Sequence, residues 1–220
     1  MRERQLDWTN FNGTEIAEEE IEALAEADLI SINLTGSRAL SKVCWRAFTR
    51  LTTLKSLCVK DCPRLAFPPS CVRDKLSPER TLKFVLFREY DISELPITSL
   101  DSGLAIELAA AGVSSIDATG CTKLENVDGD AFARITSLAS LSLGRCSALS
   151  WPHDVIVSKG GQGVVSYIRS RRYDMSGSDF KAIPEGLLED LARAQVGILA
   201  SSKHKMVILK IPNSRSRYFI

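Results

Sequence analysis

Apolar residues recur along this chain in a fixed frame. The clearest copy has Leu54, Leu57 and Val59 in the spacing L-x-x-L-x-V, followed by Cys62 and Leu65. An apolar residue at every second position predicts a short strand with one face turned towards the core. Between these stretches, apolar residues three or four positions apart predict short helices. We therefore expect a series of strand–turn–helix units.

The frame begins again every 25 to 32 residues. Its six clear copies start at Leu29, Leu54, Leu82, Val113, Leu138 and Ser170. The strands should accordingly centre on Ile32, Leu57, Val85, Ile116, Leu141 and Tyr173. Such a period is typical of repeat proteins, in which each unit buries the apolar face of its neighbour. We predict a single domain over residues 1–220, with clear repeats in 29–185 and weak terminal repeats or caps in 1–28 and 186–220.

In five of the six copies the position after the strand carries a small polar side chain. It is Cys62, Cys121 or Cys146 in three copies, and Ser37 or Ser178 in two others. A small group there can satisfy the backbone of a turn inside the core. No pair of cysteines has the C-x-x-C spacing of a zinc site. We expect these three thiols to be buried, reduced and too far apart to form disulfides.

The repeated frame resembles that of the leucine-rich repeat family. The resemblance implies an α/β fold, a curved solenoid with parallel strands on its concave face and short helices on its convex face. It also implies a protein-recognition role for the concave face. The alternative is a non-repetitive α/β domain with helices on both sides of its sheet. One strand face stays polar, as in Ser31, Asn33 and Thr35, and this alternation favours the solenoid.

Composition narrows the classes of function. The chain has 220 residues, of which 45% are hydrophobic and 25% charged, so a disordered chain is excluded. The formal net charge of +1 gives no electrostatic reason to expect nucleic acid as a partner. No apolar run is long enough for a membrane span. Because the first residues are charged and polar, we expect no secretory signal and a cytoplasmic location.

Motifs that would indicate catalysis are absent from the sequence. The glycines at 160, 161 and 163 match neither the P-loop nor the dinucleotide-binding pattern. No nucleophile elbow is present. We therefore predict that the chain is not an enzyme and takes no cofactor, metal or small-molecule substrate. An enzyme with a site that these motifs do not reveal remains the alternative.

A short stretch suggests a second context. Residues 156–169 look like the segment that joins the repeats to the GTPase module in Roco-type signalling proteins. This likeness implies an alternative function as a regulatory or targeting segment of a larger signalling protein of GTPase or kinase type, with no catalysis of its own.

We predict that the concave face binds a protein partner. In the copies that start at Leu54 and Leu82, the face should carry apolar area beside two cations, as interface centres often do. The predicted partner-binding residues are Ser56, Cys58, Lys60, Phe84, Leu86 and Arg88. The alternative is that the insertion at residues 71–80 folds back over Phe84 and Leu86.

Overall fold

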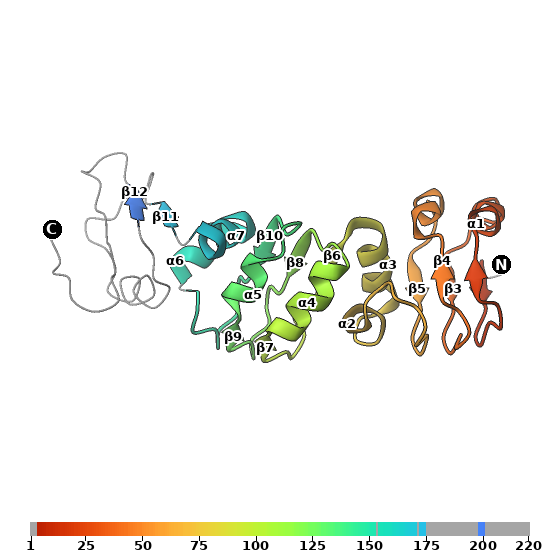
Figure 1. The fold of residues 1–220 in the computed structure, drawn as a ribbon, viewed down its shortest axis with the longest axis horizontal. Helices are drawn as coiled ribbons and strands as arrows, with labels where there is room; N and C mark the ends of the chain where they lie inside the picture. The colour runs from red at the N-terminus through yellow and green to blue at the C-terminus, as the bar shows by residue number, and fades with distance from the viewer. Residues whose placement is uncertain (1–3, 153, 171, 175–197, 201–220) are drawn as a thin grey trace, which may run out of the picture. The chain divides into compact units, whose positions relative to one another are not determined.

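The chain adopts a mixed α/β fold of short parallel strands and short helices (Figure 1). The computed structural model describes residues 4–152, 154–170, 172–174 and 198–200. The chain divides into two compact units. The first contains Met1–Ile92 and Ile106–Ser115, and the second contains Ser93–Ala105 and Ile116–Ile220.

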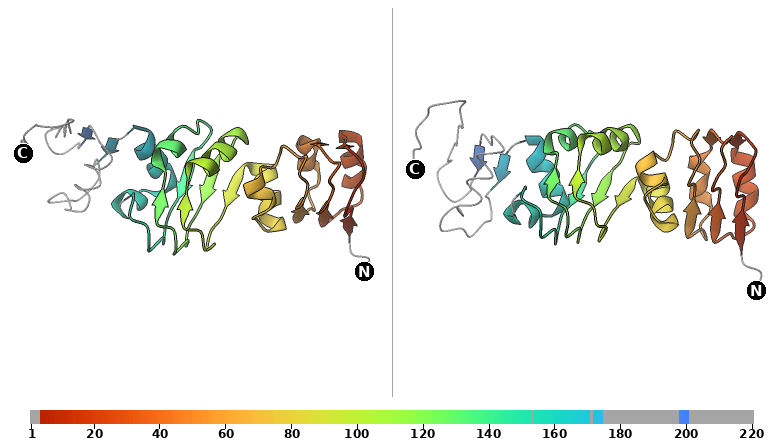
Figure 2. Two further views of the ribbon diagram at one scale, coloured as in Figure 1. Left: turned by 60° about the horizontal axis from the view of Figure 1, so that its bottom comes forward. Right: turned by 90° about the horizontal axis from the view of Figure 1, so that it is seen from below.

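The first unit is built on a three-stranded parallel sheet. Its strands are β1 (Gln5–Asp7), β3 (Ser31–Asn33) and β5 (Ser56–Cys58), in that order (Figures 1 and 2). The central residues Leu6, Ile32 and Leu57 are in register. Ile32 and Leu57 are buried, whereas the residues beside them are half-buried. The strands predicted at Ile32 and Leu57 are confirmed.

Short elements complete each repeat of this unit. The strands β2 (Glu15–Ile16) and β4 (Lys42–Val43) form a second parallel pair. Helix α1 (Glu18–Ala25) buries Ile21, and the 3-10 helix η1 (Trp45–Arg50) buries Ala47 and Phe48. The Glu20 side chain accepts a hydrogen bond from the Ala17 backbone N–H at 2.7 Å. Acidic side chains in the first turn of α1 favour the helix, because they lie near the positive end of its dipole.

The strand predicted at Val85 is wrong. Residues 70–87 contain two helices, α2 (Ser70–Arg73) and α3 (Pro78–Phe87). Ser77 caps α3, since its hydroxyl accepts from the Arg80 N–H, and Pro78 occupies the first helical turn. The next strand, β6 (Glu89–Asp91), centres on Tyr90, so the repeat frame restarts five residues later than expected.

An aromatic cluster joins α3 to the rest of the first unit. Phe84 is fully buried, and its ring centroid lies 5.8 Å from that of Phe67 and 6.4 Å from that of Tyr90. Trp45 packs on Phe67 at 5.8 Å. Helix α3 also packs on β5, the last strand of the sheet. Because α3 covers this strand, it protects a sheet edge that could otherwise pair with another chain.

The second unit repeats these elements. Its strands and helices include β7 (Ser99–Leu100), β8 (Ser115–Asp117), β9 (Asn126–Val127), β10 (Ser140–Ser142), α5 (Gly129–Ala133), α6 (Asp154–Val157), α7 (Gly160–Ser170), β11 (Arg172–Asp174) and β12 (Ile198–Ala200). Helix α4 (Ser102–Ala110) spans the division between the units. The strands predicted at Ile116, Leu141 and Tyr173 are confirmed. The predicted cap at 186–220 lies outside the described residues except for β12.

Parallel pairing also holds in the second unit. Strand β7 pairs with β9, and β11 pairs with β12, both in parallel register. The bonds from Ala118 N to the Ser142 oxygen and from Gly120 N to the Gly144 oxygen advance in the same direction, as in a parallel pair. The strand series therefore follows the repeat frame of the sequence.

Each of the six strands β1, β3, β5, β6, β8 and β10 is followed by a backbone turn in the left-handed region. The residue concerned always lies four positions after the centre of the strand. These residues are Asn10, Gly36, Asp61, Glu94, Gly120 and Arg145, with φ between 55° and 76°. In four of the six turns, the residue that directly follows is the small polar one: Ser37, Cys62, Cys121 or Cys146. The six strands thus share one turn geometry, although only two of the six residues are glycine.

A larger repeat, of 84 residues, underlies the two units. The strand centres Leu57 and Leu141 lie 84 residues apart, and so do the cis prolines Pro68 and Pro152. Within this frame, residues 47–57 and 131–141 share Ala, Phe, Arg, Thr, Leu, Ser and Leu at seven equivalent positions. The helix pair α2 and α3 therefore has its counterpart in α6 and α7. The stretch at 156–169, which suggested a Roco-type segment, belongs to this second helix pair.

The counterpart helices also bury equivalent residues. Helix α3 buries Thr81, Leu82, Phe84 and Val85, and α7 buries Val164, Val165, Tyr167 and Ile168, each 83 residues later. The ring of Tyr167 packs beside Trp151 at 6.1 Å, as Phe84 packs beside Phe67. Arg169 therefore occupies in α7 the place that Leu86 has in α3.

Candidate functional site

A row of polar side chains crosses the outer face of the first sheet. It consists of Asp7, Thr9, Asn33, Thr35 and Cys58, which we call the polar row. Asp7, Asn33 and Cys58 each follow the central residue of their strand, which is half-buried in β1 and buried in β3 and β5, so their side chains point away from the core. The threonines stand two residues further on. The same position in adjacent repeats thus supplies neighbouring groups on one face.

Hydrogen bonds join the members of the polar row. The Asn33 amide donates to the Thr9 hydroxyl at 3.0 Å and to the Asp7 carboxylate at 3.4 Å. The Thr35 hydroxyl donates to the Asn33 side-chain oxygen at 2.7 Å and lies 3.1 Å from the Cys58 sulfur. The Asn33 oxygen also accepts from the Thr35 backbone N–H. Because each group is held by its neighbour, the row keeps one arrangement before any partner binds.

The acidic end of the row is a stable anion. Asp7 accepts hydrogen bonds from the Thr9 hydroxyl and the Thr9 backbone N–H. These bonds, the hydroxyl first, lower the pKa of the Asp7 carboxyl below its ordinary value. The row therefore presents a carboxylate at one end and hydroxyl, amide and thiol groups along its length.

A polar cavity adjoins the row at the ends of the strands. It has a volume of about 710 Å³ and is lined by residues of both charge signs. Thr9 and Thr35 belong both to its lining and to the polar row. Arg38 contributes an exposed cation, and the guanidinium of Arg73 is held by Asp74 at 3.5 Å. The face and the cavity form a continuous polar surface in the first unit.

The turn cysteines are structural groups. The Cys62 thiol donates to the Leu34 carbonyl at 3.2 Å, and the Cys146 thiol donates to the Ala118 carbonyl at 3.2 Å. Burial raises the pKa of both thiols, and of Cys121, above the ordinary value. A thiol with a raised pKa is a poor nucleophile. The prediction of buried thiols is confirmed for Cys62 and Cys121, whereas Cys146 is half-buried; all three are free.

Three of the predicted partner-binding residues lie on the sheet. Ser56 and Cys58 belong to β5 and are half-buried, and the exposed Lys60 follows them. Cys58 is also part of the polar row. Ser56 and Cys58 flank the buried Leu57 and lie on one face of the strand.

The other three belong to α3 or its end, so the exposed apolar patch expected from them does not exist. Phe84 is fully buried in the aromatic cluster. Leu86 is half-buried and lines a groove beside η1. Arg88 ends the helix in the left-handed conformation, and its guanidinium lies 4.1 Å from the centre of the Phe67 ring. The correction follows from the helix at 78–87, which turns Phe84 towards the core. The ring is buried against Phe67 and Tyr90.

A cluster that the sequence did not indicate joins α2 to α4, with Cys71 and Tyr90 buried, Glu107 half-buried and Ser70 exposed. The Glu107 carboxylate accepts from the Ser70 hydroxyl at 2.8 Å and from the Cys71 backbone N–H at 3.1 Å. Burial, and then the charge of Glu107, raise the pKa of the Cys71 thiol to about 12. Burial also raises the pKa of Tyr90, which hydrogen-bonds to Cys71. The cluster resembles a catalytic arrangement in residue type only, because its thiol stays protonated.

The described residues contain no group of three or more His, Cys, Asp or Glu side chains that could hold a metal ion. In the same part of the chain, every helix is too short or too polar to cross a membrane.

The equivalent face of the second unit is partly covered. A Cβ atom on Gly161 would lie 2.1 Å from the Ser140 hydroxyl oxygen, so α7 approaches β10 at a distance that only glycine permits. Asp117 and Thr119 repeat the turn of Asp7 and Thr9, since the Thr119 N–H donates to the Asp117 side chain at 2.9 Å. Helix α3 packs on β5 in the first unit in the same way, so both units have a helix beside the last strand of the series.

Comparison of the chain with protein-family models, with curated proteins and with solved structures found no match.

Proposed function

We propose that this chain is a leucine-rich-repeat solenoid that binds another protein through the face of its first sheet, and that it has no catalysis of its own. The polar row is the observation that carries the proposal. A set of mutually bonded polar groups on an exposed strand face offers directional contacts at a low entropic cost, because their side chains are already ordered.

The surroundings of the row support a protein partner over a small ligand. The row lies on an open sheet and continues through Thr9 and Thr35 into a wide cavity of mixed charge. Small-molecule sites are mostly apolar and enclosed, whereas protein interfaces combine polar contacts with a broad surface. The half-buried Ser56 and the exposed Lys60 extend the same face.

The proposal is tested by blocking the face without touching its hydrogen bonds. Ser31→Arg combined with Ser56→Arg places two large cations among half-buried strand positions beside the row. Ala23→Arg, on the exposed surface of α1, is the matched control. Each protein is first checked for an unchanged circular dichroism spectrum and melting temperature.

Binding is then measured in two steps. Proteins captured from a cell extract are compared quantitatively for the three forms, and the best candidate is purified for a direct affinity measurement. We expect at least one protein to bind the wild type and Ala23→Arg equally, and the double variant at least tenfold more weakly. If every captured protein binds all three forms equally, the face of the first sheet is not the recognition surface.

A further inference from the structure

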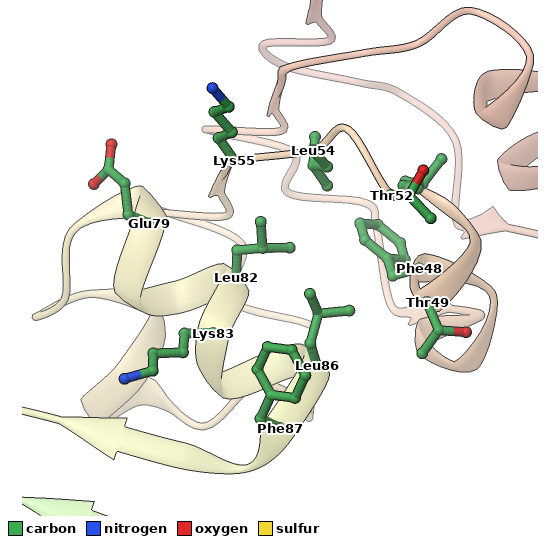
Figure 3. Close-up of a pocket in the computed structure, with 11 residues that line it drawn as sticks. Phe48, Thr49, Thr52, Leu54, Lys55, Glu79, Leu82, Lys83, Leu86 and Phe87 are labelled. Atoms are coloured by element: carbon green, nitrogen blue, oxygen red, sulfur yellow. The ribbon is translucent and has the colours of Figure 1, made fainter.

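The two copies of the 84-residue repeat differ at one groove, and the difference indicates what binds there. In the first unit an apolar groove of about 450 Å³ runs between η1 and α3 (Figure 3). Its walls include Phe48, Leu51, Leu54, Leu82 and Leu86. The groove is open, and Phe87 stands at its rim with 60% of its surface exposed.

An arginine occupies the equivalent place in the second unit. Arg169 comes from α7 and donates through one guanidinium nitrogen to three backbone carbonyl oxygens. The distances are 2.6 Å to Ile135, 3.3 Å to Thr136 and 2.6 Å to Leu138. These carbonyls follow α5, as the carbonyls of Leu51, Thr52 and Leu54 follow η1.

Identical residues in the two repeats align the groove of the first unit with the site of Arg169 in the second. Phe48, Thr52 and Leu54 have identical counterparts in Phe132, Thr136 and Leu138, each 84 residues later. On the helix side, the buried residues of α3 and α7 correspond one by one, and this correspondence sets Leu86 against Arg169. The first unit therefore keeps the three carbonyls and lacks the guanidinium.

The three equivalent carbonyl oxygens of the first unit accept few hydrogen bonds. Among the described residues, the Leu51 oxygen accepts only from the Leu54 N–H, and the oxygens of Thr52 and Leu54 accept no bond from the protein. Leu51 is also the C-cap of η1, where the partial charge of the helix end is negative. A guanidinium can place one of its NH2 groups among these oxygens, as Arg169 does with its Nη2 atom.

The charged residues at the rim are Lys55, Lys83 and Glu79. Glu79 is exposed and forms no ion pair among the described residues. Lys83 is paired with Glu89 at 2.9 Å. Lys55 and Lys83 carry their ammonium groups away from the leucine walls of the groove (Figure 3).

We propose that this groove binds an arginine side chain of a protein partner, flanked by apolar residues that pack on Leu82, Leu86 and Phe87. The guanidinium would take the place that Arg169 fills in the second unit. The proposal is independent of the polar row, because none of its residues lines the groove.

The test uses the whole chain and a short peptide probe, N-acetyl-Leu-Arg-Leu-amide. Its control is the same peptide with citrulline in place of arginine, which keeps the shape and removes the charge. Backbone amide shifts are followed during titration. We expect saturable shifts at residues 48–55 and 79–87, one peptide per chain, and at least tenfold weaker binding of the citrulline peptide.

Two exchange variants make the comparison specific. Leu86→Arg supplies the missing guanidinium from within and should abolish binding at the first groove. Arg169→Leu opens the second groove and should add a second site, with new shifts at residues 132–138. Ala23→Arg should bind like the wild type. Equal binding of both peptides, or a stoichiometry that neither exchange changes, would overturn the proposal. If the Leu86→Arg protein does not fold, Arg169→Leu still tests the proposal by itself.

Discussion

The thiol of Cys62 donates a hydrogen bond to the carbonyl oxygen of Leu34, one repeat earlier in the chain. The Ser37 hydroxyl donates to the same carbonyl at 2.6 Å and accepts from the Phe11 N–H at 3.2 Å. The small polar residue after each strand therefore bonds to the turn of the preceding repeat. This contact explains why the position tolerates serine or cysteine in different copies.

Replacement of Cys62 should show how closely the turn is packed. Cys62→Ser keeps a donor of similar size and should change the free energy of unfolding by about 1 kcal/mol or less. Cys62→Arg buries a charge without a partner and should cost about 3 kcal/mol or more. Urea denaturation of the three proteins measures both values. A Cys62→Arg protein as stable as the wild type would show that the turn opens to solvent.

The turn geometry predicts that glycine is favourable at two equivalent positions, so that introducing it at one and removing it at the other have opposite effects on stability. Arg145 and Gly36 both have positive φ, of 59° and 76°. Arg145→Gly removes the strain of a side chain in this region and should raise stability by up to about 1 kcal/mol. Gly36→Ala should lower stability by about 1 kcal/mol or more, because its Cβ would also lie 2.5 Å from the Asn10 side-chain oxygen. Thermal melts decide the signs, and the same sign for both would contradict the shared geometry.

The carboxylate of Glu107 should make stability depend on pH. Burial alone would raise its pKa, but the hydrogen bonds from Ser70 and Cys71 outweigh burial and lower the pKa below the ordinary 4.5. A group whose pKa is lower in the folded state stabilises the fold above its unfolded pKa. This stabilisation is lost as the pH falls below about 4.5 and through the folded pKa.

The matched variant Glu107→Gln isolates this contribution. Glutamine keeps an acceptor for the Ser70 hydroxyl and loses the charge, so the variant should be less stable than the wild type at pH 7. The difference in melting temperature should shrink as the pH falls from 5 to 3. A difference that stays constant over this range would mean that Glu107 acts only through its shape.

Loss of Arg169 should loosen the second unit. Its guanidinium satisfies three carbonyl oxygens, and hydrogen bonds from a charged donor contribute about 1.5–3 kcal/mol before exposure to solvent weakens them. Arg169→Leu should therefore lower stability by about 1–2 kcal/mol. Arg169→Lys should recover only part of this, because the lysine nitrogen lies one bond closer to the backbone than the Nη2 atom that makes all three bonds. Full recovery by lysine would show that the charge alone matters.

Most strands were predictable because each is specified by three consecutive residues, an apolar residue between two polar ones. Ile32, Leu57, Ile116 and Leu141 are each flanked by polar residues, so one face is specified locally. Val85 satisfied the same frame by coincidence, since an apolar helix face also contains residues three positions apart, such as Leu82 and Val85. Phe87, which completed the frame in the sequence, is exposed in the helix. Ser77 and Pro78, which begin α3, were the local signals that distinguish the two structures.

The candidate sites were predictable only in part. The polar side of the first sheet follows from the alternation at Ser31, Asn33 and Thr35, but the bonds that link Asn33 to Thr9 depend on the pairing of distant repeats. The apolar groove depends on how α3 packs beside η1, which no local pattern specifies. The missing arginine becomes visible only when Leu86 and Arg169 are aligned through the 84-residue repeat.

The even spacing of the first three strands bears on how the chain folds and how it yields to force. Gln5 pairs with Ser31 and Ser31 with Ser56, so each pairing closes a loop of nearly equal length. The entropic cost of closing a loop grows only with the logarithm of its length. Neither strand pairing therefore has an entropic advantage as the first step of folding. Helix α3 interrupts this series after β5. A chain pulled from its ends should therefore give way in steps of about one repeat, with a longer release where the helices intervene.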